Sequence, residues 1–166
     1  MYRKPVCLGP EHDLRDFDCG KPVMDAFLKD MARHNQEQGF TRTFVIADKD
    51  FTVVGYHSLC AGMIARHHVP GSIKAHQAPV EIPVALIARL AVDRRHQGQG
   101  LGAALLRNAL QSVAMAAESV AFRAVAVHAL DDGAAEFYIR YGFRQAKGME
   151  RTLLLPLKDI AASTQA

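Results

Sequence analysis

The sequence predicts a mixed α/β domain built around one central sheet. Three patterns carry this prediction: a helix followed by two strand-like segments in the first half, a glycine-rich turn between an apolar segment and an amphipathic helix, and alternating strands and helices in the second half. The length of 166 residues suits one domain with a sizeable core. We expect the domain to span residues 1–157, and residues 158–166 to form a frayed C-terminal tail.

The first half predicts a helix and an antiparallel hairpin. Pro22 in a first turn and Gly39 beyond the end delimit a helix over residues 21–38. Residues 41–47 and 51–65 are rich in β-branched and aromatic side chains, and a short polar turn separates them. The predicted apolar stripe of the helix consists of Val23, Met24, Phe27, Leu28, Met31 and Ala32.

The second half predicts strands that alternate with helices. A loop over residues 66–83 precedes the second half, and the last two strands of the chain are short. The expected elements are a buried strand over 84–92, a helix over 101–118, a strand over 121–128, a helix from Asp131 and Asp132 through Tyr141, and strands over 143–145 and 151–155.

The composition is ordinary for a globular protein, with 49% hydrophobic and 22% charged residues. The net charge of +3 permits an anionic partner without requiring one. No apolar run is long enough to span a bilayer, and no signal peptide is evident, so we expect a cytoplasmic protein. The three cysteines and eight histidines lack metal-ligand spacing, so we expect no metal site.

The run from Arg95 to Gly102 predicts a pyrophosphate-binding loop. A helix N-terminus exposes N–H groups that lack intrahelical partners, and glycine lets a phosphate approach them closely. Gly98 and Gly100 lie between a buried strand and a helix, and Arg94 and Arg95 could pair with phosphate charge. The glycine spacing differs from the dinucleotide fingerprint, and no Gly-Lys-Ser/Thr ends the loop. A flexible turn without a ligand is the alternative.

Arg95-x-x-Gly98-x-Gly100 resembles the acetyl-CoA signature of the GNAT acetyltransferases, and residues 88–92 resemble the splayed fourth strand of their fold. The resemblance implies a mostly antiparallel mixed sheet with a splayed parallel pair, helices on both faces, and acetyl-CoA as co-substrate. It also implies that strand backbone pairs with the pantetheine arm. The implied cofactor-binding residues are Leu90, Ala91, Val92, Arg95, His96, Gln97, Gly98, Gln99, Gly100, Leu101, Gly102 and Ala103.

Tyr138 is the candidate general acid. Residues 134–143 resemble the GNAT segment Ala-x-x-Phe-Tyr-x-x-x-Gly-Phe, which lies beside the CoA sulfur. An amine that attacks a thioester expels a thiolate, and a phenol can protonate it. A core tyrosine with a satisfied hydroxyl is the alternative, and Tyr141, one turn away, is the substitute candidate.

No motif positions a general base. A lysine amine is almost fully protonated at neutral pH, whereas an α-amine titrates near 7.7–8.0 and needs a base least. The pattern therefore favours an α-amine acceptor, although Glu37, Glu81 or a chain of waters could serve instead.

Segments throughout the chain resemble one GNAT branch, the toxins of type II toxin–antitoxin modules. They include residues 17–20, 41–45, 89–92 and 153–157. The resemblance implies acetylation of the α-amine on aminoacyl-tRNA, which blocks translation, together with a small ribbon-helix-helix antitoxin and a homodimer. The loop over 66–83 could form an acceptor-site wall or an antitoxin contact.

A basic rim could bind tRNA phosphates without reading sequence. The expected RNA-binding residues are Lys29, Arg33, Arg42, Arg89 and Arg94. Scattered solvated side chains are the alternative. Two other functions remain open: acetylation of a small amine, polyamine or protein N-terminus, and CoA binding in a regulatory complex without turnover.

Overall fold

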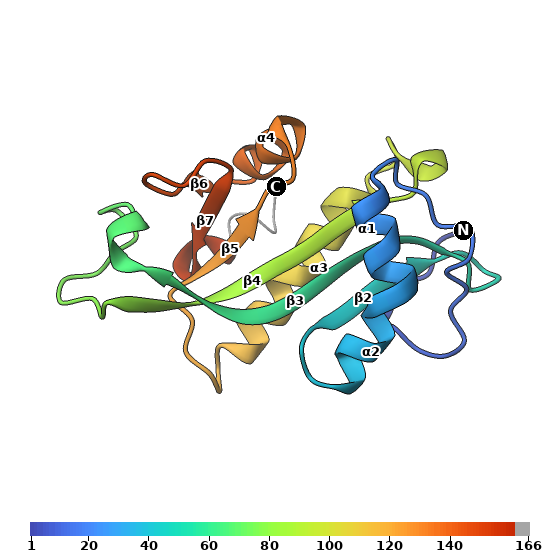
Figure 1. Cartoon of the computed structure of the whole chain (residues 1–166), viewed down its shortest axis with the longest axis horizontal. Coiled ribbons are helices and arrows are strands. Elements are labelled where there is room, and N and C mark those ends of the chain that lie inside the picture. The colour runs from blue at the N-terminus through green and yellow to red at the C-terminus, as the bar shows by residue number, and fades with distance from the viewer. Residues whose placement is uncertain (162–166) are drawn as a thin grey trace. The chain divides into compact units, whose positions relative to one another are not determined.

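The computed structural model describes residues 1–161. They divide into two compact units: unit 1 holds Met1–Cys60 and Ala88–Ala109, and unit 2 holds Ala61–Ile87 and the described residues from Leu110 onward. Three elements, which Figure 1 labels, contain residues of both units: β3 (Val53–Ala65), β4 (Glu81–Val92) and α3 (Leu101–Ala116).

The strands form a seven-stranded sheet in the order β1-β2-β3-β4-β5-β7-β6. β4 and β5 (Ala124–His128) pair in parallel, whereas β2 (Arg42–Ala47) pairs antiparallel with β1 (Val6–Cys7) and with β3. β7 (Thr152–Pro156) pairs antiparallel with β5 and with β6 (Arg144–Gln145). The prediction of a mixed, mostly antiparallel sheet with one parallel pair is confirmed. The sequence analysis missed β1, whose two residues are too short to show alternation.

Helices cover both faces of the sheet in unit 1. Val45 and Val53 lie in one core cluster with Phe27, Leu28 and Ala32 of the N-terminal helical segment. Their neighbours Ile46 and Val54 lie in another cluster with Leu101 and Leu105 of α3. Successive strand residues point to opposite faces, so this alternation places the two helical layers on opposite sides.

The N-terminal helical segment contains a π-helical turn. α1 (Pro22–Ala26) continues into η1 (Phe27–Met31) and α2 (Ala32–Glu37), and the N–H of Ala32 donates to the carbonyl of Phe27, five residues earlier. The predicted helix is confirmed, but the predicted stripe is wrong at two positions.

Val23 and Met31 are 54% and 51% exposed, whereas Phe27, Leu28 and Ala32 are buried. The wider turn adds one residue between Phe27 and the next core position, so that Ala32 rather than Met31 reaches the core.

In unit 2 the parallel strands separate at a defined point. The paired residues run from Val84↔Ala124 to Ile87↔Val127, and within the described residues β5 pairs with no residue of β4 beyond Ile87. α4 (Asp132–Arg140) follows, and the Asp131 carboxylate caps it by accepting from the N–H of Ala134 at 2.8 Å. Gly142 ends it with φ +94°, as the sequence predicts.

The predicted tail begins too early. Leu157–Asp159 form the 3-10 turn η4, Ile160 is buried, and Arg144 donates to Asp159 at 3.0 Å. Apolar burial therefore continues past residue 157, and residues 162–166 lie outside the described part. The predicted loop is also shorter, because Arg66–His68 form the 3-10 turn η2 and β4 begins at Glu81. No helix among the described residues could cross a membrane.

Candidate acetyl-CoA site

A buried carboxylate organises the turn between β4 and α3. Asp93 is 1% exposed and directly follows β4. Its Oδ1 accepts from the N–H and Nε of Arg95 at 2.9 and 3.0 Å, and its Oδ2 accepts from Nη2 of Arg95 and the N–H of Asp18 at 2.9 and 3.0 Å. Burial alone would raise the pKa of Asp93, but the hydrogen bonds from Arg95 and Asp18 outweigh it and lower the pKa to about 2. Asp93 is therefore ionised and fixes the turn η3 (Arg94–His96).

The glycines adopt the conformation that the sequence predicts for a phosphate loop. Gly98 and Gly100 have φ of +78° and +80°, a region that favours glycine. A Cβ built on either residue would meet no atom within 4 Å, so the space beside the loop is open. Gln97 closes the loop by donating from Nε2 to the Val92 carbonyl at 2.9 Å.

The loop presents a run of unsatisfied donors. Within the described residues, the N–H groups from Gln97 to Ala103 donate no hydrogen bond to the protein. The last three belong to the first turn of α3, where an α-helix leaves its donors free and the dipole favours an anion. Free donors, open space and positive φ angles together fit a pyrophosphate group.

The end of β4 lies beside this loop in unit 1. Leu90 and Val92 pack toward α3, and Ala91 packs into the cluster with Phe27. These are the residues for which the family resemblance implies backbone pairing with pantetheine. Since β5 does not pair beyond Ile87, this stretch of β4 has an edge that β5 does not occupy.

Two arginines at the loop mouth have partners within the protein that the sequence analysis did not predict. Arg95 donates to Asp93 and, at 2.7 Å, to the Asp16 carbonyl, while Arg94 donates to Asp18 at 2.8 Å. Both side chains therefore stabilise the turn through hydrogen bonds to other residues of the protein. His96 is likewise engaged, because its Nδ1 lies 2.8 Å from the Tyr2 hydroxyl. The spacing of residues in the sequence carried no sign of these acidic partners.

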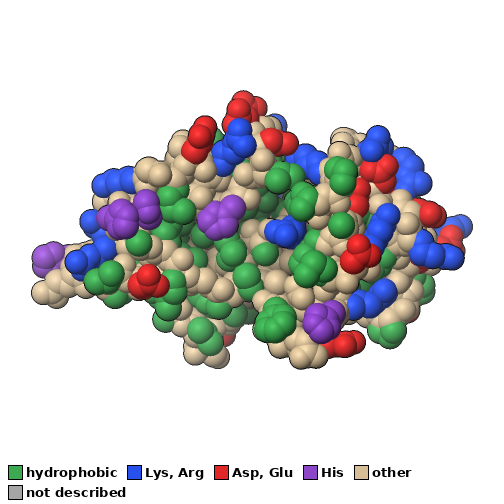
Figure 2. All heavy atoms as spheres, in the orientation of Figure 1, with side chains coloured by type: hydrophobic (Ala, Val, Ile, Leu, Met, Phe, Trp, Pro, Cys, Tyr) green, Lys and Arg blue, Asp and Glu red, His purple; other side chains and the backbone are tan. Residues whose placement is uncertain are grey.

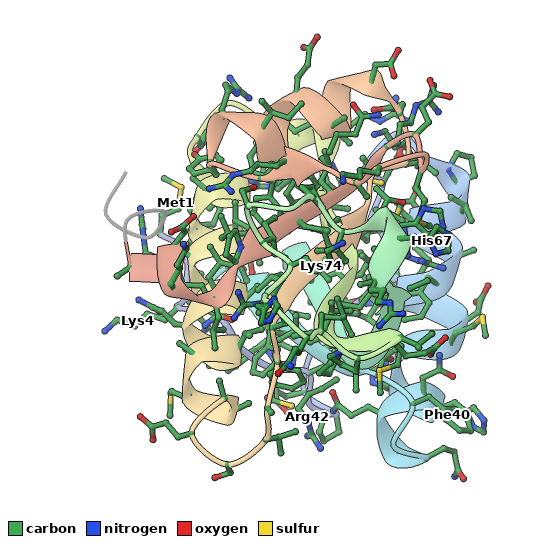
Figure 3. All side chains as sticks on the ribbon, turned by 90° about the vertical axis from the view of Figure 1, so that its left-hand side faces the viewer. Met1, Lys4, Phe40, Arg42, His67 and Lys74 are labelled. Carbon is green, nitrogen blue, oxygen red and sulfur yellow. The ribbon has the colours of Figure 1, made fainter. Side chains whose placement is uncertain are left out.

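The predicted basic rim is largely tied to the protein's own groups. Arg33 donates to the carbonyls of Gly9 and His12, and Arg42, labelled in Figure 3 at the start of β2, lies 3.7 Å from the Cys7 sulfur. Lys29 is exposed. On the face drawn in Figure 2, acidic side chains are interspersed with the basic ones rather than set apart from them.

Arg89 is the exception among these arginines. Its guanidinium lies 4.8 Å from the centre of the Phe27 ring, and its Nη1 donates to the Ala88 carbonyl. Its Nε is buried and has no hydrogen-bond partner among the described residues. Arg89 therefore keeps unused hydrogen-bonding capacity within unit 1.

Tyr138 lies in unit 2, buried in α4. Its ring makes edge contacts with Phe137 and Phe143, with centroids 5.2 and 5.3 Å apart. Burial raises the pKa of its phenol above the ordinary value, which keeps the hydroxyl protonated at neutral pH. Within residues 1–161 no hydrogen bond to this hydroxyl is found, so its proton is available to another group.

Unit 2 also holds a cavity that the sequence analysis did not predict. A pocket of about 190 Å³, here called the His128 pocket, is lined mainly by apolar side chains, with Leu86, Ala126, Met149, Thr152 and His128 among them. The His128 Nδ1 lies 2.9 Å from Oγ1 of Thr152. The available signal was a histidine at the carboxyl end of a parallel strand, where α/β sheets bind ligands.

The other histidines form no metal site. His67, labelled in Figure 3, lies 4.0 Å from His68 between ring centroids. Across the described residues, no three His, Cys, Asp or Glu side chains are grouped so that they could hold a metal ion.

Comparison with known proteins supports the chemistry of the loop. The family model described as an acetyltransferase (GNAT) domain matches residues 40–145. A tRNA-acetylating toxin of Mycobacterium tuberculosis is 38% identical over 161 residues, which covers 97% of this chain and 96% of that protein.

Two solved structures of the toxin AtaT are similar over almost their whole length. AtaT complexed with acetyl-methionyl-tRNAfMet is 30% identical with a TM-score of 0.89, and each chain is covered to 98%. A mutant AtaT bound to acetyl-CoA and the C-terminus of the antitoxin AtaR is 27% identical with a TM-score of 0.82, covering 100% of this chain and 99% of that one. The chain belongs to the GNAT acetyltransferase family and is related to its tRNA-acetylating toxins.

Proposed function

We propose that the protein transfers the acetyl group of acetyl-CoA to the α-amine of the amino acid on charged tRNA, and so acts as a translation-blocking toxin. The observation that carries this proposal is the 38% identity to a tRNA-acetylating toxin along 97% of the chain. Such coverage includes the N-terminal half, which the cofactor signature alone would not require.

The glycine loop and the end of β4 would bind acetyl-CoA in the proposed reaction. The free N–H groups from Gln97 to Ala103 would bind the pyrophosphate of acetyl-CoA, and the backbone of Leu90, Ala91 and Val92 would pair with the pantetheine arm. Bound acetyl-CoA supplies an acyl group activated as a thioester. His96 and Arg95 contact Tyr2 and Asp93 and would also line the pyrophosphate site.

Tyr138 supplies the proton in the proposed reaction. As the acceptor nitrogen bonds to the acetyl carbon, the carbon–sulfur bond breaks and the sulfur leaves with a negative charge. The Tyr138 hydroxyl, protonated and without a partner among the described residues, would donate its proton to that sulfur.

The acceptor contacts belong to the same proposal. Lys29, Arg42 and the free part of the Arg89 guanidinium would contact tRNA phosphates. Arg33 and Arg94 would take part only by exchanging their present partners. Charged tRNA is used by cytoplasmic ribosomes, so the proposed reaction places the enzyme in the cytoplasm.

We also propose two protein partners. The relative AtaT has been solved with its antitoxin AtaR, which supports an antitoxin for this chain. A ribbon-helix-helix antitoxin and a homodimeric toxin are the finer expectations, and the family resemblance is their support.

The proposal is tested with purified protein, acetyl-CoA and charged tRNA. We expect digestion of the tRNA to yield N-acetyl-aminoacyl-adenosine by mass spectrometry, whereas uncharged tRNA gives no product. Transfer to polyamines or protein N-termini with none to charged tRNA would refute the acceptor. Induced expression should also arrest growth, and co-expression of the neighbouring antitoxin gene should restore it.

A further inference from the structure

We propose that His128 is the general base that removes the proton from the acceptor amine, and that the His128 pocket receives the aminoacyl end that bears this amine. The inference rests on the proposed function and assigns the proton acceptor that no motif supplies. Three features of unit 2 carry it: the place of His128 in the sheet, the anchoring of its ring, and the lining of the pocket.

His128 lies where the parallel strands part. The last paired residues are Ile87 of β4 and Val127 of β5, and His128 is the next residue of β5. Leu86 and Ala126, which are register partners one step earlier, belong to the lining of the pocket. Ligands of parallel sheets bind beyond the carboxyl ends of the strands, so His128 lies at the end of the pocket where substrate is expected.

A hydrogen bond fixes the imidazole ring. Thr152 lies opposite His128 in the β5–β7 register and is 4% exposed, so its hydroxyl is held in place. When Nδ1 of His128 donates to this hydroxyl at 2.9 Å, the lone pair lies on Nε2, which has no hydrogen bond within the described part of the chain. The His128 side chain is exposed, so its Nε2 can reach a bound substrate.

The pocket is suited to an amino acid side chain. Its lining is mostly apolar, with Gly62 and Met149 beside Leu86 and Ala126, and its volume is about 190 Å³. An apolar cavity of about 150 Å³ is enough for a molecule the size of benzene. The geometry therefore favours tRNAs charged with apolar amino acids.

Two of the other histidines are not available as a base. His57 is fully buried against Asn108, and His12 is buried and accepts the N–H of Gly9. His68 also lines the pocket, and its Nδ1 lies 2.6 Å from the Lys147 carbonyl, so within the described residues its Nε2 is free as well. His68 follows β3 in the turn η2, whereas His128 lies at the point where β4 and β5 separate, and the His68→Gln variant below distinguishes the two.

Two carboxylates follow His128 in the chain and have partners. Asp132 pairs with Arg151 at 3.0 Å, and Asp131 caps α4. His68 is the other titratable side chain among the residues that line the pocket.

The proton balance of the step is complete. The neutral amine attacks the acetyl carbon, and Nε2 of His128 takes one N–H proton as the nitrogen–carbon bond forms. The carbon–sulfur bond breaks, and Tyr138 protonates the sulfur. His128 then releases its proton to water and Tyr138 regains one, so the products are the amide and free CoA.

The central test is the pH profile of His128→Gln with charged tRNA and acetyl-CoA. We expect kcat/KM to fall about a hundredfold near neutral pH, with the KM for acetyl-CoA unchanged. In the wild type both the amine and His128 must be unprotonated, so log kcat/KM should rise with a limiting slope of two at acidic pH. The variant should retain a slope of one.

The control is His76→Gln, which changes an exposed histidine outside the pocket and should match the wild type. Thr152→Val should lower kcat by losing the ring anchor, and Thr152→Ser should restore it. The proposal would be overturned if His128→Gln lowered kcat/KM equally at every pH and kept the limiting slope of two. It would also be overturned if the slope fell from two to one in His68→Gln but not in His128→Gln.

Selectivity tests the pocket separately. We expect the wild type to prefer methionyl-, leucyl- or isoleucyl-tRNA over aspartyl- and lysyl-tRNA, and Gly62→Leu, which fills the pocket, to reduce that preference. Equal rates for all charged tRNAs would refute the pocket while leaving the tRNA acetylation intact. If the wild type acetylates a different amine, the same His128 profile can be measured with that amine.

Discussion

Tyr138 combines a buried ring with a hydroxyl that has no partner among the described residues. We expect Tyr138→Phe to slow acetyl transfer about a hundredfold or more, because the leaving sulfur would lose its proton donor. Phenylalanine preserves the edge contacts with Phe137 and Phe143, so the fold should be retained. Single-turnover rates with acetyl-CoA measure the effect.

The matched control is Tyr141→Phe, one turn farther along the same segment. It should keep most of the activity, and both variants should melt within a few degrees of the wild type. An active Tyr138→Phe enzyme would remove this residue from the mechanism.

Residue roles were the least predictable part of the site. The positions of Gly98, Gly100 and Tyr138 could be predicted because each belongs to a local motif with a fixed spacing. The contacts of Arg94 with Asp18 and of Arg95 with Asp16 could not, because these residues are 76 and 79 positions apart and meet only through the fold. His128 was missed for the same reason, since Thr152 lies on another strand.

The glycine loop allows a matched comparison with an unrelated turn. Gly98→Ala and Gly39→Ala both place a Cβ at a φ near +78°, and neither Cβ would meet an atom within 4 Å. Each should lower the free energy of unfolding by about 1 kcal/mol through backbone strain. Only Gly98→Ala should raise the KM for acetyl-CoA, about tenfold, because a displaced donor loses a charge-assisted hydrogen bond.

Urea unfolding and steady-state kinetics check these two variants together. Equal KM values would mean that Gly98 serves only the turn. If Gly39→Ala raised the KM for acetyl-CoA as much as Gly98→Ala does, the rise would result from lower stability rather than from a lost contact with the cofactor.

The helical elements show where periodicity misleads. The boundaries of the N-terminal segment followed from Pro22 and Gly39, but the π-helical turn could not be inferred from a pattern that assumes 3.6 residues per turn. Met31 consequently fell on the predicted core face and is exposed in the structure. β1 and β6, with two residues each, were at the limit of what alternation can indicate.

At the scale of the whole molecule, the family resemblance predicted the arrangement of the sheet. It implied a splayed parallel pair, and β4 and β5 confirm that pair. The division into two units was not predictable, because β3, β4 and α3 each continue through both of them.

Acid should destabilise the molecule in two stages. Burial lowers the pKa of His57 from 6.5 to about 4, although its hydrogen bond with Asn108 opposes the shift. Between these values only the unfolded chain binds the proton, so stability falls as the pH decreases, by about 3 kcal/mol in total. Asp93, with a pKa lowered to about 2, adds a further loss below pH 3.8.

Urea midpoints measured across this range test the first stage. His57→Leu should remove the loss between pH 6.5 and 4, whereas His76→Leu at an exposed position should retain it. If His57→Leu does not fold, the imidazole of His57 in the wild type can be titrated by NMR. A midpoint near 6.5 would contradict the prediction.

The four hydrogen bonds to Asp93 have a consequence for the kinetics of ligand capture. These bonds order the loop before any ligand arrives. The loss of entropy on ordering the loop therefore occurs during folding and does not weaken the binding of acetyl-CoA. Association should therefore proceed in one kinetic phase whose observed rate increases linearly with acetyl-CoA concentration. Releasing the anchor with Asp93→Asn would add an isomerisation step, visible in stopped-flow traces as a rate that saturates.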